Sequence, residues 1–450
     1  MIERLEKLLG AENVLTQGDD KASYLQEWRG QWQGSAACVL LPKNAQEVAE
    51  IVKLARKNNA KIITQGGNTG LTAAQIAFDG VHDWVVSLKR MKKLREMDAL
   101  SDVMIVEAGM SLSDAQAEAE KAGRLFPLSL ASEGSCSIGG NIATNAGGTS
   151  VITHGNMRDL VLGLEVVLAS GEIWHGLKAL RKDNAGYDLK QCFIGSEGTL
   201  GIITAAALRL FPHPRGRAIG LFAIENVAEA IQLYARAREA AGLSLIGLEL
   251  MPRFGLELVM KHQAFRDPLA APSPWYVLIE LSGAENDAHY IDRLMELAQG
   301  DGVIAQSEAQ AQELWAMREG LSAAQKSEGP SIKHDVSVPV SKLPEFVEKT
   351  LAAIAQKFPE ARPCPFGHAG DGNLHFNISV PEGFADKQAV SDLIHQAVLS
   401  YQGSIAAEHG VGLMKRDLLK ASKSPLEMQM MAGLKGLFDP DHILNPGKVI

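Results

Sequence analysis

The sequence predicts an α+β protein built from two domains and a short C-terminal segment. Its 450 residues are long for a single hydrophobic core. Patterns typical of helices and strands alternate up to Phe211, and the stretch PHPRGR (212–217) that follows is typical of a linker. We therefore expect a first domain over residues 1–215, a second over 216–405, and a segment over 406–450 that returns to the first.

The first domain alternates helices with short strands. Residues 43–59 carry apolar side chains at helical spacing, and residues 61–64 (KIIT) are typical of a buried strand. We expect further strands at Trp84–Leu88, Val103–Val106 and Leu164–Leu168, and a helix near Ser113–Ala122. This order is compatible with either an α+β or an α/β arrangement.

The second domain also mixes strands with longer helices. Helical patterns cover residues 227–241, 309–326 and 344–358. Strand patterns cover residues 243–250, 275–281, 332–338 and 373–378. This order predicts an antiparallel sheet with helices on one side. The last residues, FDPDHILNPGKVI (438–450), are typical of a loop that packs against the rest of the chain.

The composition is that of an ordinary soluble protein, with 46% hydrophobic residues, 22% charged residues and a net charge of −9. No large basic cluster predicts a nucleic-acid-binding surface. The four cysteines form no CxxC pair, which argues against a disulfide framework and fits a reducing compartment. We see neither a secretory signal nor an apolar run of about 20 residues, the length of a spanning helix. We expect a cytoplasmic protein without a membrane span.

A glycine-rich turn, QGGNTGL (65–71), follows the KIIT strand. Consecutive glycines let several backbone N–H groups converge on an anion, although the spacing matches neither the Rossmann nor the Walker motif. Alone, this turn fits a ligand-free loop equally well. The stretch GGNIATNAGG (139–148) looks too glycine-rich for regular structure, and glycine lets the main chain approach a ligand closely. Two such loops in one domain favour a long cofactor that contains a diphosphate.

Four blocks carry a resemblance to a known family: TQGGNTGL, GSCSIGGNIATNAGG, GNMRDLVLGLEVVLASG and LRKDNAGYDLKQCFIGSEGTLGIIT. They resemble the FAD domain of the vanillyl-alcohol oxidase/p-cresol methylhydroxylase (PCMH) flavoprotein superfamily. Within it, the branch of D-2-hydroxyglutarate and D-lactate dehydrogenases is the most similar. The resemblance runs from about Glu27 to Lys448. It implies a PCMH-type FAD-binding domain followed by a substrate (cap) domain.

The resemblance also implies which residues hold FAD. They are Gln65, Gly66, Gly67, Asn68, Thr69, Gly70 and Leu71 in the first loop, Gly134, Ser135, Gly139, Gly140, Asn141, Thr144 and Asn145 in the second segment, Ile202 and Ile203, and Asn445 near the C-terminus. The first loop contains no histidine, so we expect the FAD to be bound non-covalently. One departure is Ala73-Ala74, where relatives often have two glycines.

The stretch FGHAGDGNLHFNI (366–378) holds two histidines on either side of a Gly-Asp-Gly turn. In a strand, Asn373, His375 and Asn377 share one face, and His368 can fold back beside His375. Two imidazoles and a carboxylate, with Glu408 in AAEHG (406–410) as the candidate, form a common catalytic metal set. Taken alone, such a histidine pair is more often structural.

The family resemblance favours the metal over the structural alternative. It implies that His368, His375 and Glu408 bind a divalent ion, zinc in the first instance and manganese as the alternative. It also implies that His409 is the general base of the reaction.

A substrate pocket is predicted from a helix and a strand of the second domain. Trp315, Arg318 and Ser322 fall on one helical face, and Lys333, Asp335 and Ser337 on one strand face. Taken alone, the helix fits a surface helix with a solvated arginine. The resemblance implies instead that Arg318 binds a substrate carboxylate and that Ser322, Lys333 and Asn373 complete the pocket. Lys333 favours a substrate with two carboxylates.

The function that the resemblance implies is an FAD- and metal-dependent D-2-hydroxyacid dehydrogenase. We expect it to oxidise D-2-hydroxyglutarate to 2-oxoglutarate by hydride transfer from C2 to flavin N5. D-lactate, D-malate and other D-2-hydroxyacids are alternative substrates, and a flavin-binding electron carrier is the alternative class. An electron-transfer flavoprotein, a quinone or a cytochrome would reoxidise the flavin, and analogy with relatives implies a homodimer.

Overall fold

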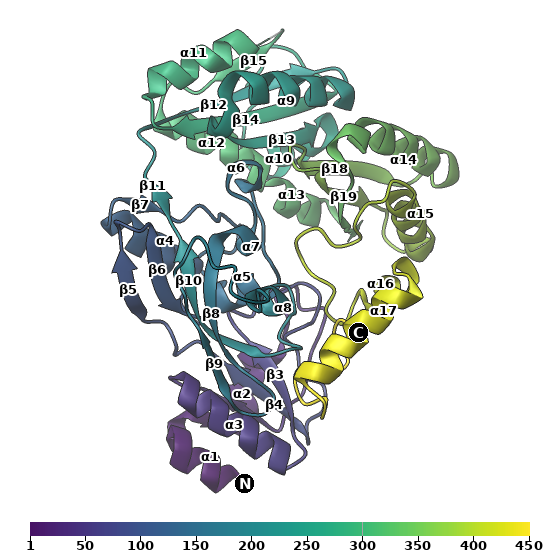
Figure 1. The fold of residues 1–450 in the computed structure, drawn as a ribbon. Coiled ribbons are helices and arrows are strands. Elements are labelled where there is room, and N and C mark those ends of the chain that lie inside the picture. The colour runs from purple at the N-terminus through teal and green to yellow at the C-terminus, as the bar shows by residue number, and fades with distance from the viewer. Residues whose placement is uncertain (299) are drawn as a thin grey trace. The chain divides into compact units, whose positions relative to one another are not determined.

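The computed structural model describes residues 1–298 and 300–450. The chain folds into two compact units (Figure 1). The first unit comprises Met1–Gly147, Gly155–His213 and Glu408–Ile450, and the second comprises Gly148–His154 and Pro214–Ala407. Among the described residues, we find no helix with both the length and the apolar character that a bilayer crossing requires.

The first unit opens with a four-stranded sheet in the order β1 (Val14–Leu15), β2 (Cys38–Leu40), β4 (Asp83–Ser87) and β3 (Lys61–Gln65). Strands β2, β4 and β3 run parallel, and β1 pairs antiparallel with β2. The predicted helix at 43–59 is α3 (Ala45–Lys57), which begins where the Asn44 side chain accepts the backbone N–H of Glu47. Short helices precede and follow β1, namely α1 (Ile2–Leu9), η1 (Ala11–Asn13) and α2 (Gly18–Leu25).

A second sheet of the first unit is antiparallel throughout. Its order is β5 (Leu94–Asp98), β6 (Val103–Glu107), β10 (Ile202–Arg209), β8 (Val161–Val167) and β9 (Ile173–Gly176). A two-stranded ribbon joins β7 (Arg124–Leu125) to β11 (Phe211–Pro212), and the helices of this part are α4 (Leu112–Lys121), α7 (Met157–Leu160) and α8 (Lys190–Phe193). One continuous apolar core contains residues of both sheets and of α3 and α4.

The sequence predicted no regular structure at 139–148, which holds for residues 144–148 but is wrong for residues 139–143. Residues Ile138–Ala143 form helix α5, and the Ser137 side chain caps it by accepting the backbone N–H of Gly140 at 3.3 Å. A Cβ on Gly139 would lie 2.7 Å from the Cβ of Ala108. Glycine is therefore needed here for close packing of the helix on its neighbour, and its low helix propensity does not prevent this short turn.

The C-terminal segment belongs to the first unit, and its last residues form the predicted packed loop. It contains α16 (Arg416–Ser422) and α17 (Pro425–Phe438). Lys435 of α17 is buried, and its Nζ donates to the backbone oxygens of Thr199 and Leu444 and to the Asp439 carboxylate. The backbone N–H of Asn445 then donates to the Ile62 oxygen, so the tail is held against β3.

The second unit is built on one antiparallel sheet, as predicted. Its order is β15 (Gly302–Ile304), β12 (Gly216–Ile224), β14 (Trp275–Gly283), β13 (Leu245–Pro252), β18 (Arg362–His368), β19 (Asn373–Ser379) and β16 (Ser331–Ile332), with β17 (Asp335–Ser337) also paired to β19. The predicted linker, residues 212–217, contains the boundary between the two units, at His213 and Pro214. Pro212 ends β11, and Gly216 begins β12.

Helices cover both faces of this sheet, whereas the sequence predicted them on one side (Figure 1). Neighbouring strand residues such as Leu221 and Phe222 point to opposite faces, and both are buried in apolar cores. One core contains α9 (Val227–Ala241), α11 (Asp287–Leu297), α14 (Leu343–Lys357) and α15 (Lys387–Ser400). The other contains α10 (Arg253–His262), α12 (Glu308–Glu319) and α13 (Leu321–Glu328). The short helix α6 (Val151–His154) contacts β13.

Two predicted elements of the second unit are interrupted. The helix at 309–326 divides at Gly320 into α12 and α13, and Gln263 Nε2 donates to the Gly320 oxygen at 2.8 Å. The strand at 332–338 divides at Lys333 and His334 into β16 and β17. There His334 Nδ1 contacts the Phe376 oxygen at 2.9 Å, and both strand pieces keep the same register with β19.

Candidate functional site

The glycine-rich loop at residues 66–71 follows β3 in the first unit. The buried Gln65 side chain fixes its base, because the amide Nε2 donates to the backbone oxygens of Tyr24 (2.9 Å) and Gln75 (3.2 Å). None of the backbone N–H groups of residues 66–71 donates a hydrogen bond within the described part of the chain. A run of unused N–H groups is the feature that binds the phosphates of a dinucleotide.

The two glycine-rich segments of the first unit lie in direct contact. A Cβ on Gly67 would lie 1.8 Å from the carbonyl oxygen of Ser135, and a Cβ on Gly66 would lie 2.2 Å from the Ser137 Oγ. Glycine is therefore required at position 67, where the clash is with the backbone, whereas a side chain at position 66 would displace only the Ser137 hydroxyl. The fold thus brings together the two segments that the sequence assigns to one cofactor. The unused N–H groups of residues 66–71 fit the diphosphate of FAD.

Several side chains predicted to contact FAD form hydrogen bonds that shape these segments. Asn68 Nδ2 donates to two backbone oxygens, of Ser23 and Gln26, and Asn68 has a φ of 58°. The remaining contacts join Thr144 Oγ1 to the Gly140 oxygen, Asn145 Oδ1 to the Arg158 N–H, and Asn141 Nδ2 to the Cys136 Sγ. Ile202 and Ile203 are buried within β10. These bonds fix the loop conformations on which a cofactor site depends.

Asn445 connects the C-terminal tail to the glycine-rich loop. Its Oδ1 accepts the backbone N–H of Thr64 at 2.9 Å, and its Nδ2 donates to the Glu197 oxygen at 2.7 Å. Lys448 Nζ donates to the backbone oxygen of Ala73 at 2.9 Å, and burial lowers the pKa of Lys448 to about 8. Ala73 has a φ of 59°, a conformation that glycine adopts more readily.

His409, the predicted base, lies on a segment that Glu197 holds in place. The Glu197 carboxylate accepts the backbone N–H groups of Val411 (2.7 Å) and Gly412 (2.9 Å). The hydroxyl of Thr72 donates to the His409 backbone oxygen at 3.3 Å. Burial raises the pKa of Glu197, and the two N–H groups oppose that rise. Neither Glu197 nor Thr72 was singled out from the sequence.

Strands β18 and β19 form a hairpin, and its turn separates His368 from His375. The ring centroids of the two histidines lie 5.9 Å apart, with their planes at 75°. As predicted, the opposite face of β19 is apolar and buried, with Leu374, Phe376 and Ile378 in the core. Gly372 closes the turn with a φ of 84°, and a Cβ there would lie 2.1 Å from the Val338 oxygen.

His368, His375 and Glu408 offer ligand atoms that all lie within 4.8 Å of one another. Glu408 directly follows the second unit along the chain, and Ser404 shortly before it pairs with Ser337 of β17. Two imidazoles and a carboxylate are a donor set that suits zinc and leaves room for a further ligand. The donor chemistry of the three predicted residues therefore fits a divalent metal ion.

Helix α12 directs Trp315 and Arg318 towards the sheet. Trp315 Nε1 donates to Glu280 Oε2 at 2.7 Å, and Arg318 Nε donates to Glu249 Oε2 at 2.6 Å. The Arg318 side chain is 9% exposed and its guanidinium lies 5.0 Å from the centre of the Phe366 ring, which excludes a solvated surface arginine. Its Nη groups make no hydrogen bond with the residues that the structure describes. They are available to a carboxylate.

Glu249 connects Arg318 to the β18–β19 hairpin. Its side chain is fully buried, and its Oε1 lies 2.5 Å from His368 Nδ1. Glu249 of β13 and His368 of β18 are also direct cross-strand partners. Burial alone would raise the pKa of Glu249, but the neighbouring His368 and Arg318 hold it at about 2. Glu249 is therefore a buried carboxylate that contacts both a predicted metal ligand and a predicted substrate ligand.

The other predicted substrate residues differ in their surroundings. Asn373 is buried, and its Nδ2 donates to Asp335 Oδ1 and the Val336 oxygen, both at 3.0 Å. Ser322 lies on α13 beyond the Gly320 break, not on the helix that carries Arg318, and it is exposed. Lys333 is also exposed, at the break between β16 and β17.

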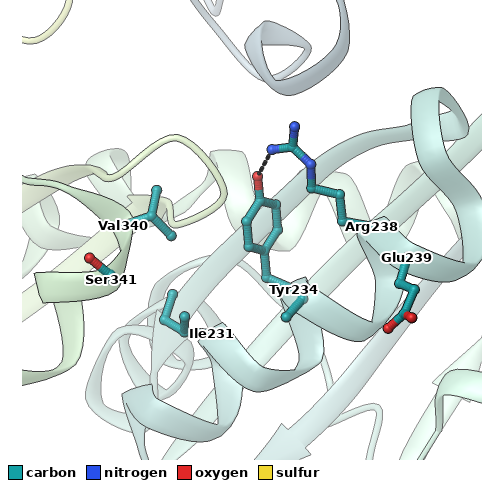
Figure 2. Close-up of a pocket in the computed structure, with 7 residues that line it drawn as sticks. Ile231, Tyr234, Arg238, Glu239, Val340 and Ser341 are labelled. Atoms are coloured by element: carbon teal, nitrogen blue, oxygen red, sulfur yellow. Dashed lines mark hydrogen bonds between the residues drawn. The ribbon is translucent and has the colours of Figure 1, made fainter.

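A separate pocket of about 630 Å³ lies between α9 and the turn η3 (Val340–Lys342) of the second unit. Figure 2 shows Tyr234 and Arg238 on one side and Val340 on the other, with the Arg238 Nη1 donating to the Tyr234 hydroxyl at 2.8 Å. None of the predicted site residues lines it. The pocket adjoins the turn of the β18–β19 hairpin, because a Cβ on Gly370 would lie 3.2 Å from the Tyr234 ring.

Sequence reasoning missed Glu249 and Glu280, although a signal for both was present. They are acidic residues within the otherwise apolar strands LIGLELMP (245–252) and WYVLIELSG (275–283). A carboxylate in such a strand must be paired if it is buried, so its position predicts a partner within the core. Arg318 is a partner of Glu249, and Trp315 is a partner of Glu280.

Comparison with known families identifies two matching regions. The family described as FAD binding domain matches residues 36–176. The family described as FAD linked oxidases, C-terminal domain, matches residues 213–449, more than half of the chain.

Relatives of nearly full length carry consistent names. A D-2-hydroxyglutarate dehydrogenase of Xanthomonas citri pv. viticola is 38% identical, over 99% of this chain and 96% of the relative. A mitochondrial D-2-hydroxyglutarate dehydrogenase of Arabidopsis thaliana is 36% identical, over 100% of this chain and 81% of the relative. A D-2-hydroxyglutarate–pyruvate transhydrogenase of Saccharomyces cerevisiae is 34% identical, over 96% of this chain and 90% of the relative.

Solved structures resemble the chain in fold. Alkyldihydroxyacetonephosphate synthase has a TM-score of 0.75 at 17% identity, covering 99% of this chain and 84% of that protein. p-Cresol methylhydroxylase has a TM-score of 0.73 at 18% identity, covering 100% of this chain and 96% of that protein. These likenesses confirm the predicted PCMH-type fold.

Proposed function

Because this chain belongs to the family of FAD-linked oxidases, an oxidoreductase family, we propose that it oxidises D-2-hydroxyglutarate to 2-oxoglutarate. One observation carries the choice of substrate: relatives named D-2-hydroxyglutarate dehydrogenase are 38% and 36% identical over 99% or more of the chain. We further propose that FAD is bound non-covalently and that His368, His375 and Glu408 hold a divalent ion, zinc first. D-lactate and D-malate are the alternative substrates to be tested beside it.

FAD, when bound, would supply the hydride acceptor, and a divalent ion would favour loss of the hydroxyl proton. His409 takes that proton, because an imidazole can accept one near neutral pH. The substrate thus loses one proton and one hydride and leaves as the 2-oxoacid. Glu197 and Thr72 hold the backbone that carries His409.

Arg318 binds a substrate carboxylate through its two Nη groups, since its Nε is occupied by Glu249. Lys333, Ser322 and Asn373 complete recognition of the far end of the substrate. A lysine charge in this set favours a second carboxylate, as D-2-hydroxyglutarate provides.

The test is anaerobic reduction of the bound flavin, which is measured as the loss of its visible absorbance. D-2-hydroxyglutarate should reduce it much faster than D-lactate or D-malate, and chelation should slow the reduction until a divalent ion is restored. His409→Ala should keep FAD but lose reduction by substrate. Faster reduction by D-lactate, or full-rate reduction in His409→Ala, would contradict the proposal.

The electron acceptor is a separate proposal. An electron-transfer flavoprotein, a quinone or a cytochrome remain candidates, and the name of the yeast relative adds pyruvate. Mixing the reduced enzyme with each acceptor and following the return of flavin absorbance would distinguish them.

Size-exclusion chromatography coupled to light scattering would test the proposed homodimer, and cell fractionation would test the proposed cytoplasmic location.

A further inference from the structure

Glu249 occupies an unusual position in the second unit. It is fully buried, and its two carboxylate oxygens contact different functional groups: Oε2 accepts from Arg318 Nε at 2.6 Å, and Oε1 lies 2.5 Å from His368 Nδ1. A buried charge is costly unless it is paired on both oxygens, so this carboxylate fixes both of its neighbours. The pairing joins a predicted metal ligand to a predicted substrate ligand.

The contact with His368 determines which ring nitrogen can bind a metal. An imidazole whose Nδ1 faces a carboxylate carries its proton there, so its lone pair is on Nε2. A carboxylate behind a ligating histidine also fixes the ring orientation and makes the ligand more basic. The cross-strand pairing of Glu249 with His368 adds a rigid backbone to this contact.

The contact with Arg318 fixes the direction of its guanidinium. Glu249 holds the Nε edge, and the Phe366 ring lies 5.0 Å beneath the guanidinium carbon. The same ring lies 5.2 Å from the His375 ring, so one aromatic residue packs against both the arginine and the second histidine. With its Nε edge and one face occupied, Arg318 presents only its two Nη groups.

We infer that Glu249 is a positioning residue that couples the metal ligand His368 to the carboxylate-binding Arg318. The inference rests on the proposed function for the roles of those two residues. It assigns Glu249 no contact with substrate or cofactor. Its loss should therefore weaken metal binding and substrate binding together, whereas a purely structural glutamate would change neither selectively.

Glu280 offers a matched control. It is also a glutamate on a neighbouring strand of the same sheet, and it also accepts a hydrogen bond from α12, from Trp315 Nε1 at 2.7 Å. It contacts neither His368 nor Arg318 in the described part of the chain. The Glu280 side chain is 15% exposed, so Glu280→Gln reports the general effect of removing a partly buried carboxylate from this sheet.

The experiment measures zinc affinity of the full-length FAD-loaded protein after chelation, by competition with a chromophoric chelator, and the Co²⁺ absorption spectrum. Glu249→Gln should weaken zinc binding about 10- to 100-fold, as loss of a carboxylate behind a ligand does. It should also raise KM for the hydroxyacid that reduces the flavin by about 10-fold, the loss of one strong hydrogen bond. Glu280→Gln should leave zinc affinity and KM unchanged.

The outcomes separate the two proposals. Zinc affinity does not depend on which hydroxyacid is the substrate, so an unexpected substrate would contradict the proposed function and leave this test intact. Wild-type zinc affinity in a folded, FAD-containing Glu249→Gln would overturn the inference, as would absence of zinc binding by the wild type. If Glu249→Gln does not fold, Glu249→Asp keeps the charge but shortens its reach, and it must weaken zinc binding while retaining FAD. Unchanged affinity in that variant would also overturn it.

Discussion

Gly67→Ala should abolish tight FAD binding. The new methyl carbon would lie 1.8 Å from the Ser135 oxygen and 2.9 Å from the Cys136 Cα, and both are backbone atoms. The loop must therefore move by about 1 Å or more to relieve the contact, and overpacking of this kind costs about 1–3 kcal/mol. Such a movement also misplaces the N–H groups of residues 66–71, which we propose bind the diphosphate. Each lost hydrogen bond to a charged group costs about 1.5–3 kcal/mol, so two of them weaken FAD binding at least 100-fold.

The measurement is a titration of the FAD-free protein with FAD, in which quenching of the flavin fluorescence reports binding. Circular dichroism confirms that the variant is folded. Gly433→Ala is the matched control, because it makes the same substitution in α17, where a Cβ meets nothing within 4 Å. It should leave FAD affinity unchanged. A folded Gly67→Ala that binds FAD within threefold of the wild type would refute the assignment of this loop to the diphosphate.

Three further predictions concern the turn, the base segment and the substrate. Gly372→Ala forces a φ of 84° on alanine and a contact of 2.1 Å with the Val338 oxygen, so it should lower the free energy of urea unfolding by about 2–4 kcal/mol; an unchanged midpoint would contradict this. Burial raises the pKa of Glu197, so its folded state binds more protons than the unfolded state. The stability advantage of the wild type over Glu197→Gln should therefore decrease as pH rises through that pKa. Urea unfolding at several pH values measures this advantage, and an advantage that grows with pH would contradict the prediction. Lys333→Ala should lower kcat/KM for D-2-hydroxyglutarate more than for D-lactate, and equal losses would argue against a role in reading the second carboxylate.

The fold was largely predictable where periodicity and turn residues agree. Helices α3, α9 and α14 and strands β3, β4 and β14 lie within a few residues of the predicted ranges. The error over α5 has a clear cause: glycine was taken as evidence against a helix, but close packing against Ala108 requires it. The helices on both sheet faces were missed because strands buried on both faces are apolar throughout and carry no alternation.

The local parts of the site were predictable, and the distant pairings were not. The sequence placed His368 and His375 on a hairpin, and the turn between them is short enough that local geometry brings them together. The contact between Glu249 and His368 joins residues 119 positions apart, and no local pattern encodes it. It depends on the order of strands in the sheet, in which β13 lies beside β18.

Glu197 and Glu249 share a feature that distinguishes them from the surface acids. Each is buried, and each uses both carboxylate oxygens: Glu197 for Val411 and Gly412, Glu249 for Arg318 and His368. Desolvation makes such groups a poor source of net stability, because well-packed apolar residues often replace them without loss. Their physical effect is instead to fix direction, since a buried carboxylate with two partners leaves neither partner free to turn. A carboxylate thus holds the backbone segment that follows the predicted base His409, and another carboxylate contacts the ring of the predicted metal ligand His368. That common arrangement is the reason to expect selective loss of function, beyond loss of stability, when either glutamate is replaced by glutamine.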